Sequence, residues 1–71
     1  MNPITATEEI VFSYPMREYL VEILYMRYSG GGECWEWRVS KNGIKRHQTE
    51  DGYGSSEPAA RDAFGWLVEN D

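Results

Sequence analysis

The sequence predicts an α+β fold: a three-stranded antiparallel β-meander packed by one C-terminal helix, in a single small domain over residues 1–71. Three observations lead to this prediction. Apolar and polar residues alternate between Trp35 and Ser40, an Asn-Gly pair follows, and apolar residues after Pro58 recur at helical spacing. Because a chain of 71 residues can build only one hydrophobic core, these elements must pack against one another.

The tryptophan segment is the clearest strand. Trp35, Trp37 and Val39 alternate with Glu36, Arg38 and Ser40, which is the period of a half-buried strand. Asn42-Gly43 then supplies residues that adopt the positive φ angles of a tight hairpin. A further strand is expected from Ile44 to Thr49, so the stretch forms a β-hairpin.

Residues 55–68 are predicted to form the helix. Ser55 or Ser56 can cap the first free amide groups, Glu57 suits the positive end of the helix dipole, and Pro58 is tolerated in the first turn. The face expected to pack on the sheet carries apolar side chains, with Trp66 at its edge. These are Ala60, Ala63, Phe64 and Leu67.

The segment from residue 16 to residue 28 fits both a helical and a strand period, and its β-branched and aromatic content favours a strand. The link Gly30-Gly31-Gly32 is short enough to return it beside the tryptophan strand. Residues 1–15 form an N-terminal extension or an edge strand over Thr7 to Tyr14, with breaks expected at Pro3 and Pro15.

This strand parity leaves an apolar outer face. If the odd-numbered residues Tyr19, Val21, Ile23, Tyr25, Trp35, Trp37 and Val39 face the helix, the even-numbered residues Leu20, Leu24, Met26, Tyr28 and Cys34 face away, among Glu22, Glu36 and Arg38. Either Ile10-Val11-Phe12 covers this face, or Leu20, Leu24 and Met26 bind a second copy or another protein. A homodimer is thus one alternative.

Enzyme chemistry is not indicated. His47 is the only histidine and Cys34 the only cysteine, with no orienting group or oxyanion donors evident for a catalytic pair. The three consecutive glycines lack the lysine of a phosphate loop, and no spacing suggests a metal or cofactor site. The N-terminus shows no signal peptide or membrane span, which predicts a soluble, cytoplasmic protein.

The net charge of −5 opposes attraction to nucleic acid and to anionic membranes, and favours a protein partner. We expect a small, acidic, non-catalytic binding module whose carboxylates occupy the basic groove of a nucleoprotein. The acids proposed for this contact are Glu50, Asp51, Glu57 and Asp62. The alternative is a nucleic-acid-binding hairpin over residues 38–47, which would use Arg38, Lys41, Lys45 and Arg46.

The C-terminal half resembles one repeat of the YegP-like small domains, whose function is uncharacterised, in the residues Trp37-Arg38-Val39, Asn42-Gly43, Gly52-Tyr53, Ser55 or Ser56, Ala60 and Ala63. The resemblance implies a short sheet followed by a helix. In size and charge, the chain is also similar to phage-encoded inhibitors of host defence, including anti-CRISPR proteins. That similarity implies an inhibitor that blocks a bacterial nucleic-acid-handling or defence complex.

Overall fold

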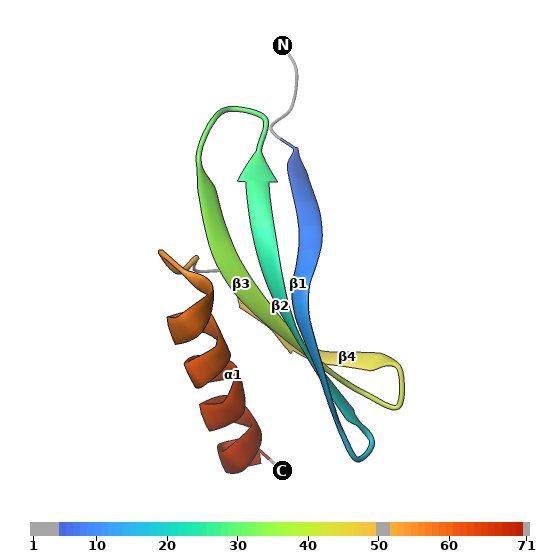
Figure 1. The fold of residues 1–71 in the computed structure, drawn as a ribbon. Coiled ribbons are helices and arrows are strands. Elements are labelled where there is room, and N and C mark those ends of the chain that lie inside the picture. Colours follow the sequence, from blue (N-terminus) through green and yellow to red (C-terminus); the bar gives the residue numbers. More distant parts are fainter. Residues whose placement is uncertain (1–4, 50–51, 71) are drawn as a thin grey trace.

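The computed structural model describes residues 5–49 and 52–70, which form one open sheet and one helix (Figure 1). The strands are β1 (Ala6–Met16), β2 (Tyr19–Tyr28), β3 (Glu33–Lys41) and β4 (Ile44–Gln48), and α1 spans Ser56–Asn70. All neighbouring strands are antiparallel, in the order β1-β2-β3-β4. The α+β class, the strand at 19–28 and the C-terminal helix are confirmed. The sheet has four strands, because the N-terminal segment pairs along β2 as an edge strand.

Pro15 does not end β1, contrary to the sequence prediction. It lies opposite Leu20 in the register with β2. The amide of Tyr28 donates to the carbonyl of Gly32, so the even-numbered residues of β2 direct their backbone groups toward β3. The Leu20–Pro15 pair therefore exchanges no backbone hydrogen bond, and the missing N–H of Pro15 falls on the free edge of the sheet, where a strand tolerates proline.

The hydrophobic core lies between α1 and the two central strands, β2 and β3. The sheet contributes Tyr19, Val21, Ile23, Trp37 and Val39, as the strand parity predicts. The helix contributes Ala59, Ala63 and Leu67, with Ala60, Phe64 and Trp66 partly buried beside them. Ala59 was not part of the predicted helix face, whereas the position of Trp66 at the edge of that face is confirmed.

The turn at Asn42-Gly43 is also confirmed, with φ angles of 51° and 82°. The β3–β4 register shifts between Val39 and Ser40, so that Val39 lies opposite His47 while Ser40 lies opposite Lys45. This irregularity lets the short strand β4 bring His47 against the ring of Trp37 at 5.0 Å between centroids.

The N-terminal segment lies beside the outer face of the sheet rather than over it. Ile10 is opposite Leu24, whereas Phe12 is opposite Ile23, because a bulge at Val11 shifts the register between them. Ile10 thus shares the outer face with Leu24, and Phe12 is turned to the helix side. The three residues therefore do not fold over the outer face as the sequence suggested: only Ile10 lies on that face, beside Leu24, and Leu24 and Met26 are both buried in the single chain.

Candidate protein-binding surface

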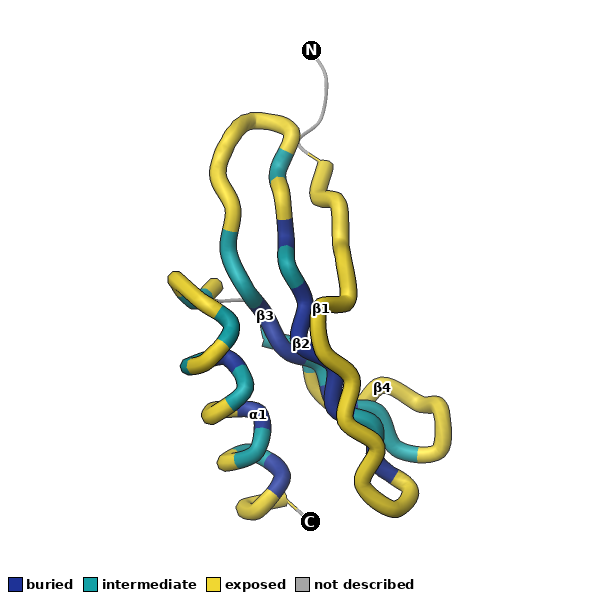
Figure 2. Tube along the Cα trace, in the orientation of Figure 1, coloured by how far each residue is buried: buried dark blue, intermediate teal, exposed yellow. Residues whose placement is uncertain are grey.

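Strand β1 carries five of the seven exposed large apolar side chains of the described chain. All its residues are exposed, as Figure 2 shows along its whole length. The exposed fractions are 50% for Ile10, 38% for Val11, 48% for Phe12, 38% for Tyr14 and 43% for Met16. Monomeric proteins seldom expose so many large apolar side chains on one short segment, which makes this strand a candidate interaction surface.

Three of these side chains lie on the helix side of the sheet. Phe12, Tyr14 and Met16 are opposite Ile23, Val21 and Tyr19, which are all in the core. The rings of Phe12 and Tyr14 stack at 6.1 Å, and the ring of Tyr14 meets the edge of Phe64 in α1 at 5.6 Å. We call Phe12, Tyr14, Met16 and Phe64 the β1 strip.

The β1 strip is exposed because one helix is too narrow for the sheet. Adjacent strands lie about 4.8 Å apart, so a helix about 10 Å wide covers two of them. Helix α1 packs on β3 and β2 and leaves the helix side of β1 uncovered. At the lower end of the strip, Met16, Arg17, Tyr19 and Leu67 line a groove of about 270 Å³.

The two ends of the strip carry opposite charges. Glu9 is opposite Tyr25 at one end, and Arg17 lines the groove at the other. Both are exposed, and neither forms an ion pair with another of the described residues. These charges are therefore available to a bound molecule.

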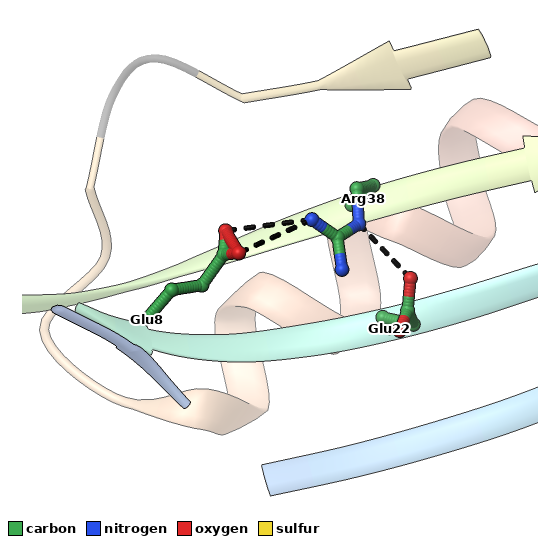
Figure 3. Close-up of polar contacts among 3 residues, drawn as sticks. All are labelled: Glu8, Glu22 and Arg38. Atoms are coloured by element: carbon green, nitrogen blue, oxygen red, sulfur yellow. Dashed lines mark hydrogen bonds and ion pairs between the residues drawn. The ribbon is translucent and has the colours of Figure 1, made fainter. Parts of the chain in front are cut away.

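The outer face of the sheet is covered by a polar network instead (Figure 3). Arg38 Nε donates to Glu22 Oε1 at 2.9 Å, and its guanidinium also reaches Glu8 Oε2 on β1 at 3.3 Å. Glu22 and Glu8 lie opposite Arg38 and Met26, on either side of Leu24 along the same face. The arginine side chain therefore crosses the position of Leu24, and its pKa is raised by the hydrogen bond to Glu22.

A second polar group lies on this face, around Tyr28. Its hydroxyl donates to Glu36 Oε2 at 3.1 Å and lies 3.7 Å from Cys34 Sγ. The hydrogen bond with Cys34, together with burial and the hydrogen bond to Glu36, raises the pKa of Tyr28 to about 12. A Cβ at position 52 would overlap the Cβ and Sγ atoms of Cys34, so the close approach of the backbone to this side chain requires Gly52.

The arrangement gives no support to a Cys34–His47 catalytic pair. Cys34 is opposite Met26 on the outer face of the sheet. His47 lies on the helix side, where it stacks on Trp66 at 5.4 Å and contacts Trp37. The sheet thus separates the two side chains.

The acids predicted to bind a basic groove do not all fall in one place. Glu57 and Asp62 are exposed on α1, but five residues of helix turn them about 140° apart around its axis. Glu57 pairs with Arg61 at 3.5 Å, and Asp62 accepts a hydrogen bond of 2.7 Å from Tyr53. Glu50 and Asp51 lie outside the described residues.

The remaining predicted binding residues are on the outer face. Leu20 is half-buried there, Leu24 has no exposed surface and Met26 is 8% exposed. A single chain therefore already excludes water from Leu24, and the apolar surface that remains available is on β1.

Two members of the predicted basic cluster are engaged in ion pairs. Arg38 binds Glu22 and Glu8, and Lys41 lies 3.8 Å from Glu18 and over the ring of Tyr19. Lys45 and Arg46 are exposed on β4 with no ion pair to another described residue. The surface left for a phosphate backbone is therefore small.

The sequence prediction missed the β1 strip. The available signal was the alternation of Phe12, Tyr14 and Met16, which is the period of a strand with one apolar face. This alternation was not recognised for two reasons: the strand was expected to end at Pro15, and Phe12 was expected to cover the outer face.

Within the described residues, no group of three or more histidine, cysteine or acidic side chains is placed to hold a metal ion. No helix in that part of the chain is long and apolar enough to cross a membrane. Comparison with protein-family models gave no match. Neither the curated proteins nor the solved structures contain a significant match to the chain.

Proposed function

We propose that this chain is a non-catalytic protein-binding domain that contacts its partner through the β1 strip. The observation that carries the proposal is the concentration of exposed large apolar side chains on one edge strand, from Ile10 to Met16. Elsewhere in the described chain, the exposed large apolar side chains are single residues, Ile44 and Val68. Scattered single residues of this kind are normal on a soluble protein.

The energy available from the strip is useful for binding. Covering the exposed parts of Phe12, Tyr14 and Met16 would remove roughly 250 Å² from water, given 150–250 Å² for a whole aromatic side chain. At ~25 cal/mol per Å² this contributes about 6 kcal/mol. Association costs about 4 kcal/mol or more, so a stable complex requires further contacts around the strip.

The charge of the chain favours a basic partner. A net charge of −5 accelerates the approach of a positively charged protein and opposes that of nucleic acid. An inhibitor that blocks a bacterial nucleic-acid-handling or defence complex is one role that fits this combination. In this role the acids steer the approach and the β1 strip provides the short-range contact.

Affinity capture from a bacterial lysate tests the proposal when matched variants are compared. We expect a partner retained by the wild-type chain to be lost by a Phe12→Ser, Tyr14→Ser double variant and retained by Ile44→Ser. Ile44 is the matched control because it is 69% exposed on β4, away from the strip. Circular dichroism confirms that each variant is folded.

A Glu57→Gln, Asp62→Asn variant separates the apolar from the acidic surface. Loss of the partner in this variant, with full retention by the β1 double variant, would assign binding to the acids and contradict the proposal. Partial loss at high salt in the wild type is expected, because steering by the net charge is screened.

A further inference from the structure

We infer that the groove lined by Met16, Arg17, Tyr19 and Leu67, which we call the end groove, binds the C-terminal residue of a partner polypeptide. The inference rests on the proposed function and names the part of the partner that the end of the β1 strip receives. It follows from an arginine and a tyrosine hydroxyl group that have no partner among the described residues, and from the apolar side chains beside them.

The end groove lies at the end of the molecule where the β1–β2 hairpin turns beside the C-terminal half of α1 (Figure 1). Met16 and Tyr19 are opposite each other in the last pair between β1 and β2, and Arg17 follows Met16 in the turn. Leu67 comes from α1 and belongs to the core. Because Met16 is also part of the β1 strip, the groove is continuous with that surface.

Arg17 provides a cation for an anionic group. It is exposed and forms no ion pair with another of the described residues. The carboxylate of the adjacent residue, Glu18, lies 3.8 Å from Lys41 Nζ instead. A planar guanidinium group matches a carboxylate through two parallel hydrogen bonds, so Arg17 suits a carboxylate in particular.

Tyr19 provides a second hydrogen-bond donor. Only 9% of the residue is exposed, and its ring is part of the core. Its hydroxyl group forms no hydrogen bond with another described residue. Because every buried side-chain oxygen in the described part of the chain has a partner, the hydroxyl group of Tyr19 must reach the surface. Tyr19 lines the end groove, so this hydroxyl group is free to donate to a carboxylate bound there.

The apolar side chains of Met16 and Leu67 lie beside these two donors in the same groove. A C-terminal residue with an apolar side chain matches this arrangement, because it carries an apolar group and a carboxylate on one Cα. An internal aspartate or glutamate has no apolar group beside its carboxylate. The groove volume of about 270 Å³ is below the roughly 300–1,000 Å³ of pockets for drug-sized ligands, so the groove has room for about one residue.

The neighbouring charges on β3 and α1 are compatible with an anion in the groove. Lys41 Nζ lies 5.2 Å from the centroid of the Tyr19 ring, which adds a positive charge near the site. Glu69 is two residues after Leu67, about 200° around the helix axis, and therefore faces away from the groove. Every polypeptide ends in a carboxylate, so a partner with a net positive charge can also supply this group.

One peptide in two chemical forms tests the inference. The probe is a fluorescently labelled octapeptide with lysines in its first half and a C-terminal leucine, prepared as the free acid and as the C-terminal amide. The two forms have the same side chains, but the amide has no carboxylate. We expect the wild-type chain to bind the acid at least about tenfold more tightly than the amide, measured by fluorescence anisotropy. Equal affinities, or no binding of the acid at about 1 mM, would overturn the inference.

The variant Arg17→Asn locates the carboxylate. Asparagine tolerates the left-handed conformation that Arg17 adopts, with φ 59°, so the turn is kept. We expect this variant to bind the acid about tenfold more weakly and the amide as the wild type does. Arg27→Asn is the matched control, because Arg27 is also exposed without an ion pair to a described residue but lies near the other end of β2. Equal losses in both variants would assign the effect to net charge and contradict the inference.

The variant Tyr19→Phe removes the hydroxyl group and leaves the ring in the core. We expect the affinity for the acid to fall at least about threefold, while the affinity for the amide and the midpoint of urea unfolding stay unchanged. Unchanged affinity for the acid would contradict the contact between Tyr19 and the carboxylate.

Further outcomes separate this inference from the proposed function. If a captured partner depends on Phe12 and Tyr14 but not on Arg17, the end groove does not bind the carboxylate and the proposed function stands. If 4-methylpentanoate displaces the labelled peptide as well as the unlabelled acid does, the groove binds small carboxylates and the polypeptide is excluded. If neither capture nor peptide binding depends on these three residues, both proposals fail.

Discussion

Leu24→Ala is predicted to destabilise the domain by about 3 kcal/mol, although Leu24 lies on the face of the sheet that has no helix. Leu24 has no exposed surface, and the substitution deletes three buried carbon atoms. At ~0.8 kcal/mol per buried methylene group this costs about 2.4 kcal/mol before any cavity is counted. Because Arg38 can settle partly into the space, we expect a total of about 3 kcal/mol, near the lower end of measured Leu→Ala costs.

Urea unfolding followed by circular dichroism measures this loss, with Ile10→Ala as the matched control. Ile10 is directly opposite Leu24 on the same face but is 50% exposed, so its truncation should cost about 1 kcal/mol. The midpoint should fall while the slope of the unfolding curve stays constant, which indicates a change in stability alone. A loss below about 1 kcal/mol for Leu24→Ala would refute the burial of Leu24 beneath Arg38.

Three further predictions concern the core, the alkaline titration and the basic hairpin. Trp37→Ala should unfold the domain, because truncating a buried tryptophan costs about 3–5 kcal/mol, and an unchanged melting temperature would contradict its burial. Because the pKa of Tyr28 is raised, its contribution to the stability of the fold is fully present below about pH 10 and is lost as the pH rises through about 12. The difference in tyrosinate absorbance between the wild type and Tyr28→Phe, followed against pH, should show this late ionisation. For the basic hairpin, we expect that the wild type does not bind an oligonucleotide at low salt and that the Lys45→Ala, Arg46→Ala variant does not bind it either. If the wild type binds in a salt-sensitive way and the variant does not, the nucleic-acid alternative is restored.

Local sequence patterns predicted the helix side of the sheet because each pattern acts within one element. The alternation around Trp37 and Val39 follows directly from the two-residue period of a strand whose one face is buried. Asn42-Gly43 likewise defines its own turn through its positive φ angles. The strand and the turn could therefore be predicted without knowing the order of the strands in the sheet.

The outer face could not be predicted in the same way, because its cover depends on contacts between distant residues. Arg38 and Glu8 are 30 positions apart, and their contact requires β1 to pair beside β2 in one particular register. That register in turn depends on the bulge at Val11, for which the sequence carries no plain signal. The sequence therefore predicted an interface at Leu20, Leu24 and Met26. In the structure, Arg38 from β3 extends over this face to bind Glu22 and Glu8.

The pairing of β1 with β2 also explains why the candidate binding surface lies on β1, whereas the sequence predicted it on the outer face. Once β1 joins the sheet, Glu8 completes the network with Arg38 over Leu24, and the apolar outer face no longer requires a partner. The bulge then turns Phe12 to the opposite side, next to a helix that is too narrow to cover it. None of the described segments lies over Phe12, which is 48% exposed. The net charge of −5 opposes attraction to nucleic acid, and the bulge at Val11 and Pro15 oppose the addition of an extended strand to the free edge of β1.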